Sequence, residues 1–341
     1  MNRIRAFPAP CRGRDGSLLL IALVAVSVVT LLALALGAWI RAQGSALESN
    51  RYRREIRDGT RQAALLWLAE RILPDTNAWD AAGEPWAAAP WERREEGWIM
   101  RVSADGWRDE PGATAPPLDE SGKLPLNLAP VPLLAALLRE AAALPAVVAE
   151  GQARRIVDWR DADARAEGGG EIGEAEAYGT RGQPWQAPNR AFVSVAELAR
   201  VPGLTPESCD ALMPLVTIEA PDRLNLNTAP ESVLRAALPV LGGGDTSAAF
   251  RLMGRILAFR RAGNRFTVAT ATAIGRELGG LPADEAALLG RMEGFVTVVS
   301  SAVSGVAEAT PAAAWEAGRR GGRAYFTWSR EHHAFTRWAD E

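Results

Sequence analysis

The stretch "RDGSLLLIALVAVSVVTLLALALGAWI", residues 14–40, decides the fold class. From Ser17 to Ile40 it carries no charged residue. A helix over this run is about 36 Å long at ~1.5 Å per residue, enough to cross a hydrocarbon core of roughly 30 Å. A cleaved signal peptide stays an alternative, but its apolar region usually has only ~7–15 residues. The run predicts a transmembrane helix over 17–40.

The charges beside this run predict its orientation. Arg3, Arg5, Arg12 and Arg14 precede it, against Asp15 alone. Because positive charge is retained in the cytoplasm, the N-terminus stays inside and the remaining ~300 residues are exported. The sequence therefore predicts a single-pass inner-membrane protein with a periplasmic C-terminal domain.

The helix is expected to continue beyond the membrane. Apolar or small residues recur at helical spacing at Ile56, Gly59, Ala63, Leu66 and Leu73. This stripe predicts one continuous helix to about residue 73, half in lipid and half in a globular domain. An ordinary anchor followed by an amphipathic linker remains the alternative.

Composition narrows the classes of function. The 341 residues have room for about two domains, and a net charge of −3 gives no overall basic field for nucleic acid. Cys11 and Cys209 lie on opposite sides of the apolar run, so they cannot pair. The two histidines, His332 and His333, would point to opposite faces of one strand. No phosphate loop, zinc spacing or nucleophile elbow is present, so no enzyme is expected.

Carboxylates are concentrated at residues 158–176, "DWRDADARAEGGGEIGEAE". Clustered carboxylates in a loop containing glycine suit a hard cation such as calcium, which takes six to eight oxygen ligands. The EF-hand spacing is absent, because Arg165 stands at the third ligand position. A solvated acidic loop that caps a helix is the alternative.

Two segments further on predict helical hairpins. In "FVSVAELARVPGLTPESCDALMPLVTI", 192–218, Ser194 and Glu197 form a capping box and Pro202-Gly203 a turn. In "LNLNTAPESVLRAAL", 224–238, Thr228 and Glu231 predict a second box. A strand is expected at 97–102 and a helix at 131–144. Residues 189–292 are expected to form an all-helical unit.

Five motifs resemble one family in the same order along the chain. They are "DESGKLPLNL", "IVDWRDAD", "PNRAFVSVAEL", "FVSVAELARVPGLTPE" and "LNLNTAPESVL". Together with the N-terminal helix they resemble the type II secretion minor pseudopilin K family, from Gly16 to about Phe295. The resemblance places helix-hairpin-helix-like motif residues at Gly203, Asn225, Asn227 and Thr228.

This resemblance implies an α+β fold: a pilin-like core, made of a long N-terminal helix and a small antiparallel sheet, with a large all-helical insertion. Core strands are expected near 97–128, and a C-terminal sheet from 294–307 and 323–335. The implied domains are a leader at 1–16, the transmembrane helix at 17–40, a core from 41–129 and 291–341, and an insertion at 130–290, with the acidic loop at 158–176 and the hairpin motifs at 192–290.

It also implies processing and partners. Prepilin peptidase would cut after Gly16 and leave Ser17 as the first residue. Pilins usually carry a glutamate at the fifth mature position; Ile21 stands there, as is characteristic of K proteins. The implied role is the tip of the pseudopilus, with the I and J minor pseudopilins as partners and the outer-membrane secretin or exported cargo beyond them.

The resemblance further implies a structural calcium ion in the exported domain. It assigns as ligands Asp158, Asp161, Asp163, Glu174 and Glu176. A different function remains open, since helix-hairpin-helix units often bind DNA. A membrane-anchored DNA receptor would use the arginines between 251 and 265, although Glu207 and Asp210 beside the first hairpin would repel phosphate.

Overall fold

The computed structural model describes residues 15–95, 97–104, 115–169, 172–179, 187–219, 223–318 and 321–340. Residues 1–14 of the predicted leader lie outside this range. The chain divides into two compact units, 1–56 and 57–341.

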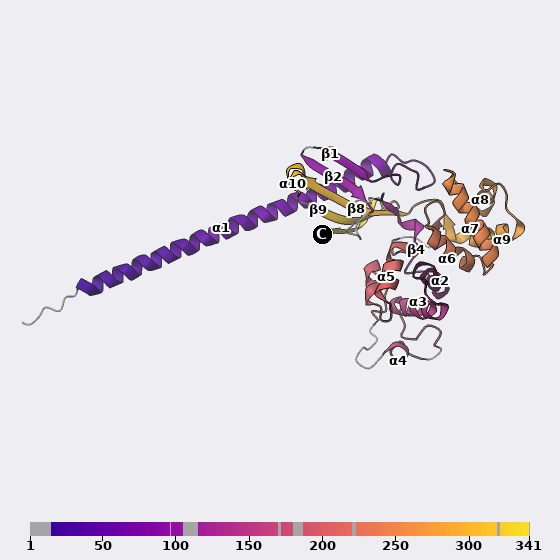
Figure 1. Cartoon of the computed structure of the whole chain (residues 1–341), viewed down its shortest axis with the longest axis horizontal. Coiled ribbons are helices and arrows are strands. Elements are labelled where there is room, and N and C mark those ends of the chain that lie inside the picture. Colours follow the sequence, from indigo (N-terminus) through magenta and orange to yellow (C-terminus); the bar gives the residue numbers. More distant parts are fainter. Residues whose placement is uncertain are drawn as a thin grey trace, which may run out of the picture. The chain divides into compact units, whose positions relative to one another are not determined.

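The first long element is helix α1, Asp15–Trp67, followed by a π-helical segment, η1, Leu68–Ile72 (Figure 1). The predicted long helix is confirmed. Its apolar side chains in the first unit are exposed, including Leu19 at 73% and Ile21 at 61%. In the described part of the chain, this is the one helix long and apolar enough to cross a membrane.

The C-terminal end of α1 packs inside the second unit. Ala63, Trp67 and Leu68 are buried there. In the π-helical segment the amide of Leu73 donates to the carbonyl of Leu68, five residues back. This wider turn keeps Ile72 on the buried face and turns Leu73 outward, so the predicted place of Leu73 on the buried stripe is wrong.

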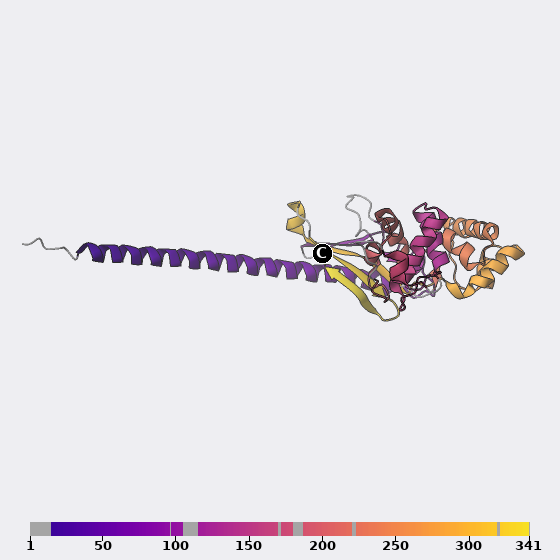
Figure 2. The same cartoon turned by 90° about the horizontal axis from the view of Figure 1, so that it is seen from below.

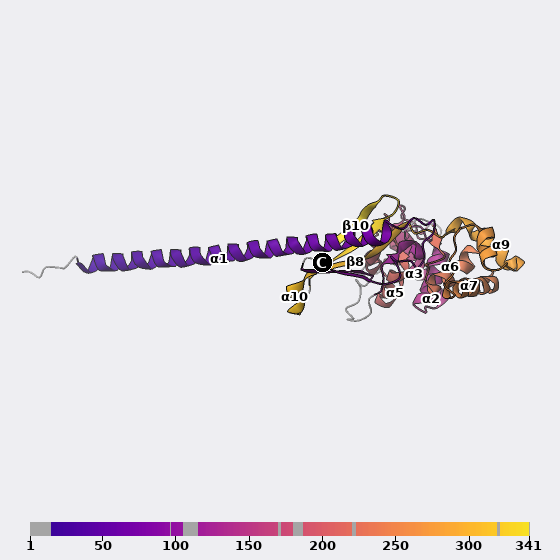
Figure 3. The ribbon, with the colours of Figure 1, turned by 90° about the horizontal axis from the view of Figure 1, so that it is seen from above.

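An antiparallel sheet packs against this end of the helix. Its strand order is β1-β2-β8-β9-β10, and β3 also pairs with β8. Figure 3 shows β10 beside the end of α1. The strand expected at 97–102 is confirmed as β2. The bounds are β1 Trp91–Glu95, β2 Trp98–Ser103, β3 Leu118–Asp119, β8 Ala302–Pro311, β9 Gly322–Ser329 and β10 Ala334–Asp340.

The face of the sheet next to α1 is rich in aromatic side chains. Trp67 lies 5.7 Å from Phe326 between ring centroids, and Phe335 packs edge-on against both Phe326 and Trp338. A short helix, α10 Ala312–Glu316, follows β8. Burial of Trp67 and Phe326 and partial burial of Phe335 and Trp338 fix the helix on the sheet, since large aromatic side chains remove much apolar area from water.

The chain between β3 and β8 is mostly helical and lies beyond one end of the strands (Figures 1 and 2). The helices are α2 Val131–Ala141, α3 Ala146–Arg160, α4 Glu174–Tyr178, α5 Pro206–Leu212, α6 Glu231–Leu241, α7 Thr246–Arg261, α8 Ala271–Glu277 and α9 Ala283–Met292. Short 3-10 turns are η2 Glu120–Gly122, η3 Val195–Arg200, η4 Met213–Leu215 and η5 Glu293–Phe295.

These helices form two copies of one arrangement, here called repeat 1 (124–217) and repeat 2 (224–297). Repeat 1 begins with β4 Leu124–Pro125 and ends with β5 Val216–Thr217, which pair in parallel. Repeat 2 begins with β6 Leu224–Asn225 and ends with β7 Val296–Thr297, which pair in the same way. Two helices, a helical hairpin and a 3-10 turn lie between the strands of each repeat.

The repeats differ at one connection. After α3, repeat 1 has a long connection that carries the acidic loop and α4, whereas in repeat 2 only residues 262–270 join α7 to α8. The first element of the hairpin predicted at 192–218 is the 3-10 turn η3 and not an α-helix. Ser194 still caps it, by accepting from the amide of Ala196.

Candidate functional site

Three of the predicted carboxylates are brought together at the acidic loop. Asp161, Asp163 and Glu174 each offer an oxygen, and these oxygens lie within 4.8 Å of one another. Glu174 is buried, and an oxygen of Asp161, Oδ1, is buried without a hydrogen-bond partner. Hard oxygen donors at this spacing suit a cation such as calcium.

The electrostatics of the loop also suit a cation. Burial raises the pKa of Asp161 to about 6, and the charges of Asp158, Asp163 and Glu167 add to the rise. Burial likewise raises the pKa of Asp158. Because neighbouring negative charges contribute to this rise, a bound cation would stabilise the ionised carboxylates.

The other two predicted ligands lie outside this group. Asp158, at the end of α3, is fully buried and accepts from the amide of Glu167 with both oxygens, at 3.0 and 3.2 Å. Asp158 therefore holds the loop backbone. Glu176 lies exposed on α4, two residues beyond Glu174.

The predicted hairpin residues separate into two places. Gly203 has φ +88° and forms the turn before α5, beside Arg155. Asn227 donates to the carbonyl of Phe266 at 2.9 Å and accepts from its amide at 2.8 Å. These hydrogen bonds join the start of repeat 2 to the segment before α8.

Asn225 and Thr228 instead join repeat 2 to the sheet. Both donate to the same oxygen of Asp119 in β3, at 2.8 and 2.6 Å. The predicted capping role of Thr228 is wrong, because Pro230 precedes α6 without a side-chain cap. The hydroxyl is used by Asp119, whose burial raises its pKa although four hydrogen bonds lower it.

A second carboxylate group lies in the loop after η1, in Asp75, Asp80 and Glu84. A guanidinium fills this group: Arg330 lies 2.5 Å from Asp80 and 3.4 Å from Asp75. Asp80 also accepts from the amide of Ser300 at 2.7 Å. The group is therefore a buried ion-pair network that joins the loop to the β9–β10 turn.

The arginines considered for DNA have partners inside the domain. Arg251 and Arg255 both pair with the buried Glu285, at 3.1 and 2.9 Å. Arg260 donates to the carbonyl of Ala229, and Arg265 stacks on Trp79. Arg261 lies 3.6 Å from Glu231.

The amides of the second hairpin turn, Gly279 and Gly280, donate to carbonyls of α8. These arginines and the two glycine amides thus make contacts within the domain.

Among the described residues, the two histidines and Cys209 are the side chains to consider as nucleophiles or bases. His332 and His333 lie in the β9–β10 turn and not on a strand, which corrects the sequence expectation; His332 closes that turn against Ser329. Cys209 is buried, and burial raises the pKa of its thiol, which makes it a poor nucleophile.

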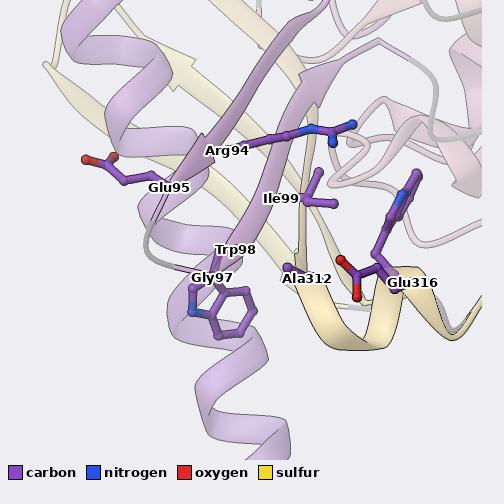
Figure 4. Close-up of a pocket in the computed structure, with 8 residues that line it drawn as sticks. Arg94, Glu95, Gly97, Trp98, Ile99, Ala312 and Glu316 are labelled. Carbon is purple, nitrogen blue, oxygen red and sulfur yellow. The ribbon is translucent and has the colours of Figure 1, made fainter.

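An open groove of about 320 Å³ lies between the β1–β2 turn and α10 (Figure 4). Trp98, Ile99 and Trp315 line it together with Arg94 and Glu316. None of these residues is a nucleophile paired with a base, so the groove does not resemble an active site.

Comparison with known proteins gives a match to a family model and matches to solved structures. Residues 119–221 match the family model described as type II secretion system (T2SS), protein K. This region belongs to the type II secretion protein K family. The fold of the protein K region and its surroundings also resembles a chain in the crystal structure of the GspK–GspI–GspJ complex from the type 2 secretion system of enterotoxigenic Escherichia coli.

That likeness has a TM-score of 0.56 and 16% sequence identity, and it covers 88% of this chain and 98% of the other. It establishes a shared fold. Comparison with curated proteins found no match.

Several residues that matter in the two repeats were missed from the sequence. The segments "LPLNLAP" at 124–130 and "LNLNTAP" at 224–230 are offset by 100 positions, as are Arg160 and Arg260. Each of these arginines donates to the carbonyl of the repeat's alanine, Ala129 or Ala229. A search for internal similarity would have revealed the repeats.

Proposed function

We propose that this chain is a minor pseudopilin that assembles at the tip of a type II secretion pseudopilus, with I- and J-type minor pseudopilins as partners. The match of residues 119–221 to the protein K family carries the proposal. The long helix α1 and the antiparallel sheet support it, because they supply the parts of a pilin-like subunit. The GspK–GspI–GspJ complex, to which the fold is similar, suggests the partners.

The inserted helices support the tip position. Residues between β3 and β8 add two helical repeats to the small sheet. A subunit stacked above this one would have to find room for these helices, which favours a terminal place in the fibre. Ile21 agrees with that place, since an apolar residue there needs no charged neighbour in the lipid.

Processing tests the proposal directly. Mass spectrometry of the N-terminus should find a chain that starts at Ser17 when prepilin peptidase is present and at Met1 when it is absent. Gly16→Leu should block the cut, and Gly37→Leu, a matched change within the apolar run, should not. A cut beyond residue 36 would indicate a secretory signal instead and overturn the proposal.

Assembly supplies the second test. The full-length chain, co-expressed with the I and J pseudopilins of its own system, should copurify with both in detergent. Loss of the chain should stop pseudopilus initiation and protein export. Normal initiation without it would contradict the tip role.

We also propose that Asp161, Asp163 and Glu174 hold a calcium ion. The buried Asp161 oxygen without a hydrogen-bond partner supports this. The ion would offset two of the three negative charges and cross-link the loop to α4. Titration calorimetry should show calcium binding that Asp163→Asn and Glu174→Gln each weaken by at least about tenfold. Glu176→Gln, on the same helix, should leave the affinity unchanged.

A further inference from the structure

The short helix α4 faces two sites at once. Its first residue, Glu174, belongs to the carboxylate group, and its last, Tyr178, lies four residues on. Residues four apart share one face of a helix, so both side chains point to the same side of α4. A movement of Glu174 therefore moves Tyr178.

Tyr178 makes two contacts with α3. Its hydroxyl donates to the carboxylate of Asp158, and the guanidinium of Arg155 lies 4.5 Å from the centre of its ring. Burial, together with this hydrogen bond, raises the pKa of Tyr178, so the hydroxyl stays a donor. A cation over an aromatic face is held in place by the ring.

Arg155 in turn supports the first hairpin turn. It donates to the carbonyl of Pro202 at 3.2 Å, and its Nε would lie 2.9 Å from a side-chain carbon added at Gly203. Gln152, one turn earlier on α3, donates to the carbonyl of Gly203 at 3.3 Å. The turn at 202–203 thus accepts hydrogen bonds from two side chains of α3, and Tyr178 packs against one of them, Arg155.

Repeat 2 has the same turn without this support. Gly280 has φ +90° and precedes α9 as Gly203 precedes α5, yet nothing lies within 4 Å of a carbon added there. Arg255, the counterpart of Arg155, pairs with Glu285 instead. Repeat 2 also has no acidic loop between its second and third helices.

We infer that Tyr178 and Arg155 are positioning residues that transmit the state of the carboxylate group to the Pro202–Gly203 turn. The inference rests on the proposed calcium site. Without a cation, three carboxylates within 4.8 Å repel one another, and a helix of five residues cannot hold its shape alone. Glu174 then moves, Tyr178 leaves Arg155, and the turn loosens.

Hydrogen exchange on the full-length chain in detergent tests this coupling. With excess calcium chloride, a peptide that spans 201–208 should exchange about tenfold more slowly than with a chelator. A peptide that spans 278–285 should not respond, because its turn has no link to the loop. This second turn is a control within the same molecule.

The variant Arg155→Met should bind calcium with unchanged affinity in calorimetry, since Arg155 is no ligand, but should abolish the calcium effect on 201–208. Arg255→Met, its counterpart in repeat 2, should leave that effect intact. Calcium binding with unchanged exchange at 201–208 would overturn the inference alone. Absence of calcium binding would overturn the proposed cation site and the inference with it, while the pseudopilin role would stand.

Discussion

Asn127 and Asn227 make the same pair of hydrogen bonds in two different repeats. Asn127 donates to the carbonyl of Phe192 and accepts from its amide, and Asn227 does the same with Phe266. A primary amide can replace one strand residue in this way, because it offers a donor and an acceptor side by side. Each asparagine therefore fastens the start of its repeat to the segment that opens the hairpin.

Replacing these asparagines should destabilise the two repeats unequally. Asn227→Ala leaves the amide and carbonyl of the buried Phe266 without partners, which should cost about 1–3 kcal/mol. Asn127 is only half-buried, so water can replace its bonds and Asn127→Ala should cost less. Hydrogen exchange at Leu226 and Phe266 for Asn227→Ala, and at Leu126 and Phe192 for Asn127→Ala, measures the difference. Asn264→Ala, at an exposed position, is the control; an equal effect from all three changes would contradict the argument.

Lys123 is the single lysine of the chain, and it neutralises a buried carboxylate. Its ammonium lies 2.7 Å from Glu120, which also accepts from Ser304. Burial raises the pKa of Glu120, but the charge of Lys123 and the hydrogen bonds from Lys123, Ser304 and Thr217 together outweigh it and hold that pKa below its ordinary value. Lys123→Met should therefore lower the free energy of unfolding by about 3 kcal/mol, because it leaves the charge of Glu120 buried without its partner.

Thermal unfolding in detergent checks this effect, with Lys123→Arg as the variant that keeps the charge. An amine-specific acylating reagent gives a second readout, since it can label only Lys123 and the N-terminus. Labelling of Lys123 should be slow in the folded chain and fast in denaturant. Fast labelling under folding conditions would contradict the buried ion pair.

Asp80 should make stability depend on pH. Burial raises its pKa from 3.8 to about 7, although Arg330 lowers it. Between these two values the folded chain keeps a proton that the unfolded chain has released. The free energy of unfolding should therefore fall as the pH rises through this window and stop changing on this account above about pH 7.

Melting temperatures between pH 4 and 8 test this sign. Asp80→Asn should reduce the slope below about pH 7, while Asp58→Asn, on the exposed side of α1, should not. Other buried carboxyl groups keep part of the slope in both variants. Identical slopes in Asp80→Asn and in the unmodified chain would contradict the assignment.

Gly59 permits the close approach of α1 to the sheet. A side-chain carbon added there would lie 3.1 Å from both Ala309 and the ring of Trp98. Gly59→Leu should therefore force the helix and sheet apart and cost about 1–3 kcal/mol. Gly44→Ala, with open space around it, should be neutral or slightly stabilising. The melting temperatures of the two variants test this difference. Equal values would contradict the close approach of α1 to the sheet at Gly59.

The sequence predicted the elements whose signals are local. The uncharged run from Ser17 and the apolar–polar alternation at 97–102 are patterns of residues adjacent in the sequence. Both predicted elements are present, as α1 and β2. The hairpin turns were also found, since Pro202 and Gly203 punctuate the chain whatever surrounds them.

What the sequence could not show depends on distant partners. Thr228 has the spacing of a helix cap, yet Asp119, more than a hundred residues earlier, takes its hydroxyl. Five carboxylates were predicted as ligands, and the folded loop brings only Asp161, Asp163 and Glu174 together. Asp158 accepts a hydrogen bond from a loop amide instead, which the sequence does not reveal. Local patterns show which side chains could cap a helix or bind a cation. Contacts with residues distant in the sequence decide which of these roles each side chain has.

The central strands of the sheet come from distant parts of the chain. β2 pairs with β8 through Arg101 and Glu308, about 200 residues apart in sequence. During synthesis from the N-terminus, β2 therefore has no partner strand while both helical repeats emerge and fold from nearby contacts. The sheet closes last, so a chain stopped before residue 302 would carry folded helices on an unfinished core and present the open edge of β2 to quality-control proteases.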